Sequence, residues 1–161
     1  MSRGMVSPLT TFFLALLVAT SFSFAQKKVD SAKEKSLYDR LGGVYTIAAL
    51  VDDFIDRVVA DDILNANPAV KEARSHLTKA GFKYRLTEQV CMVTGGPCKY
   101  SGRSMKESHK HLNITQIEWD AFIVDFKASL AKFNVPEKEQ GELLAIVGST
   151  KKDIVISTQM K

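Results

Sequence analysis

Apolar side chains recur at helical spacing through most of this chain, and no stretch shows the strict alternation of a strand. Between Val44 and Ala60 an apolar residue returns at every third or fourth position, while charged residues occupy the opposite face. The same spacing returns over residues 81–94 and on the C-terminal side of Thr115. We therefore expect an all-α fold, in which facing helices can enclose a cofactor.

Glycine, proline and capping residues divide these helices. Gly42-Gly43 ends a short helix that begins at Ser36, and Gly95-Gly96-Pro97 ends a later one, because proline lacks an amide hydrogen and clashes with the preceding turn. Two capping patterns, each with a glutamate three residues after the capping hydroxyl, begin helices at Ser104 and Thr115.

Other parts of the helical pattern are less regular. Residues 65–68 are rich in turn formers, and residues 69–80 fit no pattern clearly. A single last helix is expected after Pro136, which a first helical turn tolerates. The helix after Thr115 is expected to bury Trp119, Phe122, Ile123, Phe126, Leu130 and Phe133. Acidic residues are scattered over polar faces, where we expect them to be solvated.

The first 25 residues differ in composition from the rest of the chain. Arg3 precedes an apolar run, and no acidic residue occurs before Asp30. Small residues at and before Ala25 suit a signal peptidase, so we predict a secretory signal peptide over residues 1–25 and a polar linker over residues 26–35. The other interpretation is an uncleaved membrane anchor, although the run is short for a span of ~20 residues.

The rest of the chain suits one globular domain over residues 36–161. Cleavage would leave a secreted or periplasmic protein without a stable membrane span. The formal net charge of the whole chain is +4, too small and too evenly spread to indicate nucleic-acid binding. Cys91 and Cys98 could pair in an oxidising compartment or remain free.

Three histidines are the candidates for a metal-binding centre. No cysteine or histidine cluster has zinc-site spacing, and no glycine-rich phosphate loop or nucleophile–base pair is evident. His109 lies four residues after Met105, so the two share a helical face. A lone histidine on such a face is more often a core or surface residue than a ligand, and both interpretations stay open. His111 and His76 are expected to be solvated.

One segment resembles a known family. Gly-Gly-Pro-x-x-Tyr-x-Gly-Arg-x-Met-x-x-x-His over residues 95–109 resembles the haem-binding segment of the group I truncated haemoglobins. Residues 37–43 and 52–61 are also similar to that family, and the likeness extends over about residues 36–157. It implies a truncated globin fold, a two-over-two helical sandwich around haem.

The resemblance also implies a role for particular residues. His109 matches the proximal histidine that ligates iron, and Tyr100 matches a tyrosine near the haem propionates. Met105, Ile114, Trp119 and Phe122 match positions on the proximal side or at the haem edge, while Phe54 matches an aromatic residue on the distal side. The implied cofactor is haem b (iron protoporphyrin IX), held without a covalent bond, since no CxxCH motif occurs.

The distal side departs from the family pattern. Ile55 replaces a common distal tyrosine, and the distal helix carries Phe82, Arg85 and Leu86. The resulting pocket would be apolar and would bind dioxygen weakly, because bound dioxygen needs a hydrogen-bond donor. Tyr84 and Arg85 are the nearest donors, and they either turn inward or stay at the solvent side or the propionates.

The preceding link departs as well. Asn67 and Pro68 stand where the family usually places phenylalanines, and the link is several residues longer.

The resemblance therefore implies a haem globin that binds a diatomic gas: oxygen, for transport or storage, nitric oxide or carbon monoxide. The alternative is a haem enzyme or redox protein acting in nitric oxide dioxygenation, a peroxidase-like reaction or electron transfer. Turnover outside the cytosol would require a periplasmic electron donor. A helical domain that has lost its haem is a further possibility, and whether the chain is an enzyme stays open.

Overall fold

The computed structural model describes residues 34–156. The predicted signal peptide and the linker up to residue 33 lie outside the described residues. Within the described part, no helix is long and apolar enough to cross a membrane. The helices found there are α1 (Leu37–Arg40), α2 (Gly43–Ala60), α3 (Asp62–Asn65), α4 (Pro68–Ser75), α5 (Lys79–Val93), α6 (Met105–His109), α7 (Gln116–Lys132), α8 (Glu137–Ser149) and α9 (Lys151–Ile154).

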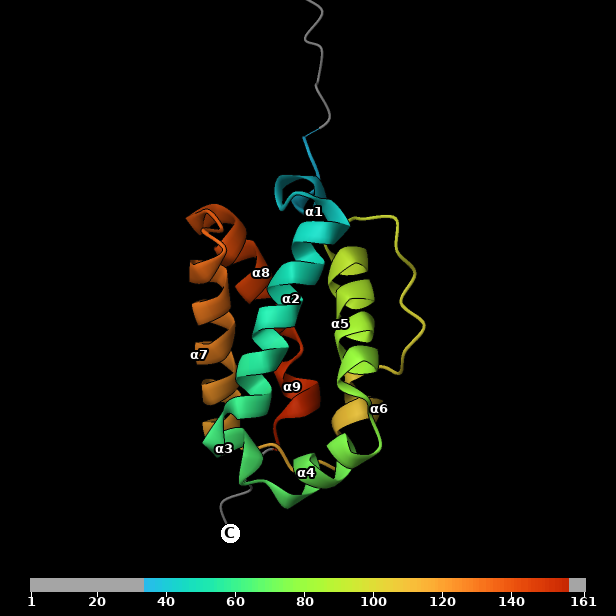
Figure 1. Ribbon diagram of the computed structural model, residues 1–161, viewed down its shortest axis with the longest axis vertical. Coiled ribbons are helices and arrows are strands. Elements are labelled where there is room, and N and C mark those ends of the chain that lie inside the picture. The colour runs from blue at the N-terminus through green and yellow to red at the C-terminus, as the bar shows by residue number, and fades with distance from the viewer. Residues whose placement is uncertain (1–33, 157–161) are drawn as a thin grey trace, which may run out of the picture. The chain divides into compact units, whose positions relative to one another are not determined.

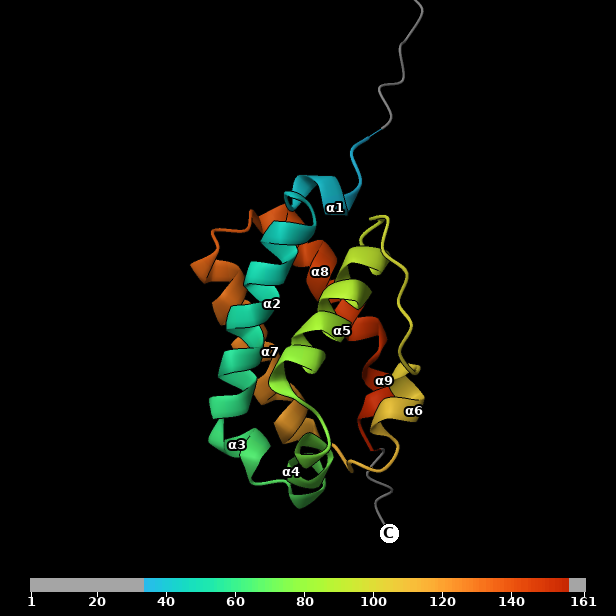
Figure 2. The same ribbon diagram turned by 45° about the vertical axis from the view of Figure 1, so that its right-hand side comes forward.

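Two antiparallel helix pairs form the framework of the domain. α2 packs beside α5, and α7 and α8 also run in opposite directions (Figures 1 and 2). α2 also packs along α7, which joins the two pairs, and α6 packs beside α9. This arrangement confirms the predicted all-α, two-over-two globin fold.

A glycine turn connects α1 to α2. Gly42 and Gly43 both have positive φ angles, +87° and +80°, which a side chain would strain. The hydroxyl of Tyr38 accepts a hydrogen bond from the amide of Val44 at 3.1 Å and so holds the first turn of α2. The predicted short helix from Ser36 is present as α1, with Ser36 as its cap rather than its first helical residue.

The link that the sequence left ambiguous is mostly helical. Pro68 occupies the first turn of α4, and Asn67 caps this helix with its side-chain oxygen, which accepts from the amides of Ala69 and Val70. Thr78 then caps α5, which begins at Lys79, two residues before the predicted start.

The prediction of a single last helix was wrong. The chain instead forms α8 and α9, which are separated at Thr150. The Thr150 hydroxyl donates to the carbonyl of Val147 at 2.7 Å, and the Ser149 hydroxyl donates to that of Ile146 at 2.7 Å. Such side-chain bonds compete with the helical ladder and explain why the helix ends there.

The core lies mainly between α2 and α7. Ile55 and Leu130 are fully buried and Val51 is nearly so. In α7, the prediction of burial is confirmed for Trp119, Phe126 and Leu130, whereas Phe122, Ile123 and Phe133 are only half-buried.

The expectation that acidic residues are solvated was wrong for several of them. Glu118 and Glu139 are each 7% exposed, and the side chain of Asp53 is 13% exposed. Each is buried together with partners: Glu139 with Arg40 at 2.9 Å, and Glu118 with Thr115 and Asn67. These contacts connect distant parts of the chain, and a periodicity argument on one helix cannot reveal them.

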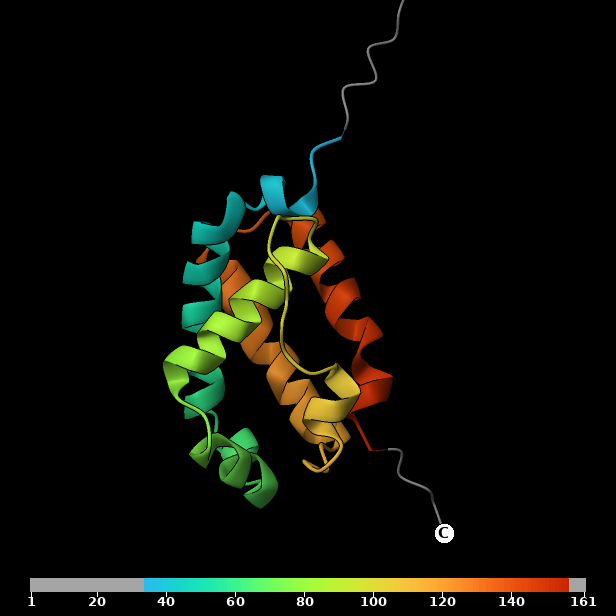
Figure 3. The same cartoon turned by 90° about the vertical axis from the view of Figure 1, so that its right-hand side faces the viewer.

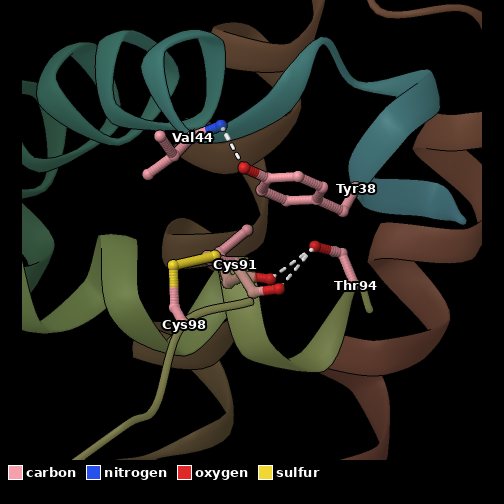
Figure 4. The surroundings of a disulfide bond; sticks show 6 residues. Tyr38, Val44, Cys91, Thr94 and Cys98 are labelled. Atoms are coloured by element: carbon pink, nitrogen blue, oxygen red, sulfur yellow. Dashed lines mark hydrogen bonds between the residues drawn. A yellow bond between two sulfur atoms is a disulfide. The ribbon is translucent and has the colours of Figure 1, made fainter. Parts of the chain in front are cut away.

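Cys91 and Cys98 form a disulfide bond, which resolves the alternative that the sequence left open. Their Cα atoms are 5.7 Å apart, and the bond connects the end of α5 to the following loop (Figure 4). Gly96 lies between them, and a Cβ atom there would come within 2.4 Å of the Tyr38 ring. The loop therefore packs tightly on α1.

Candidate cofactor site

A cavity of about 1210 Å³ opens between α5, α6 and the helices behind them. Its lining includes Ile47, Leu50, Val51, Phe54 and Val58 from α2, Phe82, Leu86, Gln89, Val90 and Val93 from α5, and Leu143, Ile146 and Val147 from α8. Most of these side chains are hydrocarbon. A cavity of this size and character suits a large, flat and mainly apolar ligand.

His109 is held at the end of α6 and lines this cavity. The capping side chain of Ser104 begins that helix by accepting from the amide of Glu107. Nδ1 of His109 lies 2.7 Å from the carbonyl oxygen of Met105. The carbonyl can only accept, so Nδ1 carries the proton, and Nε2 keeps the lone pair that a metal requires.

The residues predicted for the proximal side come together around His109. Met105, Ile114, Trp119 and Phe122 all line the cavity. The Trp119 and Phe122 rings are stacked with centroids 5.9 Å apart. Ile114 is 9% exposed, and its carbonyl accepts from the amide of Ile156 at 2.9 Å, which holds the C-terminal strand-like segment against this wall.

The opposite wall carries three of the residues predicted to be distal. Phe54, Phe82 and Leu86 line the cavity, and the Phe54 ring packs against Phe122 with centroids 5.0 Å apart. Ile55 is fully buried and is not part of the lining, so the structure does not bring it to the cavity.

Tyr84 points away from the cavity. It is 61% exposed and does not belong to the lining. A hydrogen bond with Glu88, one turn later, raises the pKa of the Tyr84 hydroxyl. Of the two placements that the sequence left open for this tyrosine, the structure therefore shows the solvent side.

Arg85, Tyr100 and Arg103 lie at the rim of the cavity. The guanidinium of Arg85 contacts Glu88 at 3.2 Å and the Ser101 hydroxyl, so it lies at the surface rather than deep in the cavity. The Tyr100 hydroxyl donates to the carbonyl of Arg103 at 3.0 Å. A rim of two guanidinium groups and a phenol suits the carboxylates of a mainly apolar ligand.

Many of the lining residues were not predicted from the sequence, among them Gln89, Val70 and Leu77. Gln89 extends an amide toward the Met105 sulfur at 3.7 Å, and Val70 and Leu77 from the region of α4 close the end of the cavity. Gln89 lies one helical turn after Arg85 and two turns after Phe82 on α5. This spacing could have revealed it as a lining residue. Nothing in the sequence pattern indicated the position of α4.

The residues present fit a haem. The described part of the chain contains no group of three or more histidine, cysteine or acidic residues that could hold a metal ion alone. It does contain one histidine with its Nε2 available, beside a large apolar cavity with a cationic rim. This combination suits an iron atom whose other ligands come from a porphyrin.

Fold and cavity together define a globin of the two-over-two class, and comparison with known proteins agrees. Residues 36–156 match the family described as bacterial-like globin. The chain belongs to this family and is a group I truncated haemoglobin. It is 33% identical over 129 residues to the group 1 truncated hemoglobin of Synechocystis sp., across 74% of this chain and 97% of that protein.

Solved structures show the same likeness. The truncated hemoglobin of Tetrahymena pyriformis in its Fe(III) form is 27% identical and superposes with a TM-score of 0.67, covering 76% of this chain and all of that one. The 2/2 hemoglobin of Synechococcus sp., solved in the cyanomet state with covalently attached heme, is 26% identical with a TM-score of 0.66, covering 75% and 98%.

Proposed function

We propose that this chain binds haem b without a covalent bond and that His109 Nε2 ligates the iron. The observation that carries the proposal is the hydrogen bond from His109 Nδ1 to the Met105 carbonyl at the edge of the cavity. Bound haem would supply an iron position that binds a diatomic gas reversibly. His109 would hold the iron from the α6 side, leaving the side of α2 and α5 for the gas.

The apolar walls would exclude water from the iron. Phe54, Phe82 and Leu86 offer no hydrogen-bond donor, and their hydrocarbon would keep water away from the gas position of a bound haem. Trp119 and Phe122 would pack on the other face of the ligand. Arg85, Arg103 and Tyr100 would face the propionates, which carry negative charge.

The distal side favours carbon monoxide and nitric oxide over dioxygen as the gas, because Phe54, Phe82 and Leu86 carry no donor and the Gln89 amide is directed to the Met105 sulfur. Bound dioxygen carries a partial negative charge and gains more from a donor than the other two gases do. Oxygen transport is therefore the less favoured physiological role. We further propose that the protein works outside the cytosol, in the periplasm or after secretion, which the N-terminal sequence pattern and the disulfide support.

Absorption spectra of the purified mature chain test this proposal. They are recorded in the ferric state, after reduction with dithionite, and after addition of carbon monoxide. A Soret band that sharpens and shifts with carbon monoxide supports a histidine-ligated haem with an open gas position. Absorption bands that do not change when carbon monoxide is added would show that side chains of the protein ligate the iron from both sides of the haem. Absence of a Soret band after haem addition would contradict haem binding altogether.

A further inference from the structure

Positive charge is concentrated in one segment beside the cavity. The described residues 34–156 contain 17 Lys and Arg and 17 Asp and Glu, so their formal charges cancel. Between residues 99 and 110, however, Lys99, Arg103, Lys106 and Lys110 face one acid, Glu107. This segment therefore has a net charge of +3 and the other described residues a net charge of −3. The even spread expected from the sequence was wrong.

Most of this charge is not neutralised locally. Lys110 pairs with Glu107 at 3.0 Å. Among the described residues, no carboxylate lies within 4.0 Å of Lys99, Arg103 or Lys106, and all three are exposed. We call Lys99, Arg103, Lys106 and Lys110 the basic face. Arg103 is shared with the cavity rim and Lys110 is paired, so the exposed charges of Lys99 and Lys106 are the ones left to act on a partner.

The basic face adjoins the opening of the cavity. Ser101, Gly102 and Arg103 line the cavity. The loop that contains them runs from the end of α5 to α6, which ends at His109 (Figure 3). A partner bound here would lie against the edge of a ligand inside the cavity.

The surroundings favour a protein partner over a lipid surface. Between residues 94 and 116 no large hydrophobic side chain is exposed, whereas segments that bind membranes insert such residues. The one aromatic residue in the segment, Tyr100, is half-buried and bonds to the backbone, so it is not free to stack on a nucleic-acid base.

We propose that the basic face docks an acidic protein that carries one electron, and that this protein reduces the haem iron. The proposal rests on the proposed function, because the electron needs an acceptor in the cavity. The donor loses one electron, ferric iron gains it and becomes ferrous, and no covalent bond forms or breaks. Complementary charge would speed the encounter and align the donor with the cavity opening.

Stopped-flow reduction of the haem-loaded ferric protein tests the proposal. The probe is a reduced, acidic plant-type [2Fe–2S] ferredoxin, whose potential is low enough to reduce haem iron. We expect the bimolecular rate constant to fall at least about tenfold between about 20 and 200 mM salt. The double variant Lys99→Glu/Lys106→Glu should lower it about tenfold or more at low salt.

The matched control is Lys127→Glu/Lys138→Glu, which changes the net charge equally at exposed residues of α7 and α8, outside residues 99–110. It should change the rate constant by less than about twofold, as expected if local charge steers docking. Equal losses in the two double variants would overturn the proposal, because net charge alone would then explain them. Salt-independent reduction would overturn it too. Dithionite, a small reductant, should reduce all variants alike.

Failure of the proposed function gives a different result. If the chain takes up no haem, titration calorimetry with oxidised ferredoxin still tests docking. Binding that Lys99→Glu/Lys106→Glu abolishes would support the basic face even then, and absence of binding would overturn it. Co-sedimentation with phosphatidylserine vesicles, lost in the same variant while ferredoxin fails to bind, would assign the face to a membrane and overturn the proposal.

Discussion

Nδ1 of His109 lies 2.7 Å from the carbonyl oxygen of Met105, one helical turn earlier on α6. This contact holds the imidazole ring and sets which nitrogen carries the proton. A neutral carbonyl also polarises the ring less than a carboxylate would. The same residue pair therefore determines the geometry and the electronic character of the proposed iron site.

Replacing His109 by Ala should abolish stoichiometric haem uptake, because the other imidazole of the described lining, His76, is exposed and lies 3.0 Å from Glu72. The measurement is haem titration followed by the Soret band. Imidazole added to the His109→Gly variant should restore a histidine-like spectrum, which a purely structural role would not explain. His111→Ala is the matched control, since His111 is exposed and should change little. Unchanged uptake in His109→Ala would contradict the assignment.

Leu86→Gln should slow dissociation of dioxygen from the ferrous protein. The new amide would donate a hydrogen bond to bound dioxygen, worth about 1.5–3 kcal/mol for an acceptor with charge, or about tenfold to a hundredfold in rate. Carbon monoxide dissociation should change far less. Flash photolysis and stopped-flow mixing measure both rates.

Tyr84→Phe is the control for that prediction, because Tyr84 is exposed and lies outside the lining. It should leave dioxygen dissociation unchanged. If this variant speeds dissociation instead, Tyr84 turns inward when ligand binds, and the apolar description of the distal side is wrong.

The sequence predicted those features that depend on local spacing. Capping residues placed α6 and α7, and the helical face shared by Met105 and His109 is present as expected. The motif around residues 95–109 identified the family. Local chemistry determines each of these features, so each can be recognised within a few residues of sequence.

Features that depend on contacts between distant residues were not predictable in this way. The amide of Asn67 donates to Glu118 at 2.5 Å and to the carbonyl of Leu112 at 2.9 Å, which anchors α4 against the start of α7. These partners are 51 and 45 residues away in sequence. Ile55 faces the core rather than the cavity for a similar reason, because packing against neighbouring helices decides which face of α2 turns inward.

Removing the disulfide with Cys91→Ser/Cys98→Ser should lower the free energy of unfolding by about 2 kcal/mol, because the unfolded chain loses a short covalent loop. The same variant should lose haem faster, since the loop that follows leads to the cavity rim at Tyr100. Urea unfolding and haem transfer to apomyoglobin measure the two effects. Adding a reductant should lower the stability of the parent protein but not that of the variant. Equal sensitivity of both would show that the bond does not form in solution.

Stability should depend on pH through Asp53, which packs between α2 and α7. Burial acts to raise its pKa, but hydrogen bonds from Lys132, Arg57 and Ser129 outweigh burial and hold the pKa well below the ordinary value of 3.8. Asp53→Asn should therefore lower the free energy of unfolding by about 1–2 kcal/mol at pH 7. The effect is no larger because Arg57 and Lys132 are partly exposed, so solvent screens their charges.

The sign of the pH effect follows from proton binding. Below the ordinary pKa of 3.8 the unfolded chain binds a proton at Asp53 while the folded chain does not, so folding loses free energy as the pH falls. The stability difference between the parent and Asp53→Asn should be complete above about pH 5 and shrink as acid approaches the folded pKa. Urea unfolding at several pH values measures it. Asp120→Asn, at an exposed carboxylate bonded to Gln116, should change stability by less than about 0.5 kcal/mol. A difference that grows in acid would contradict the assignment of these contacts to a charged Asp53.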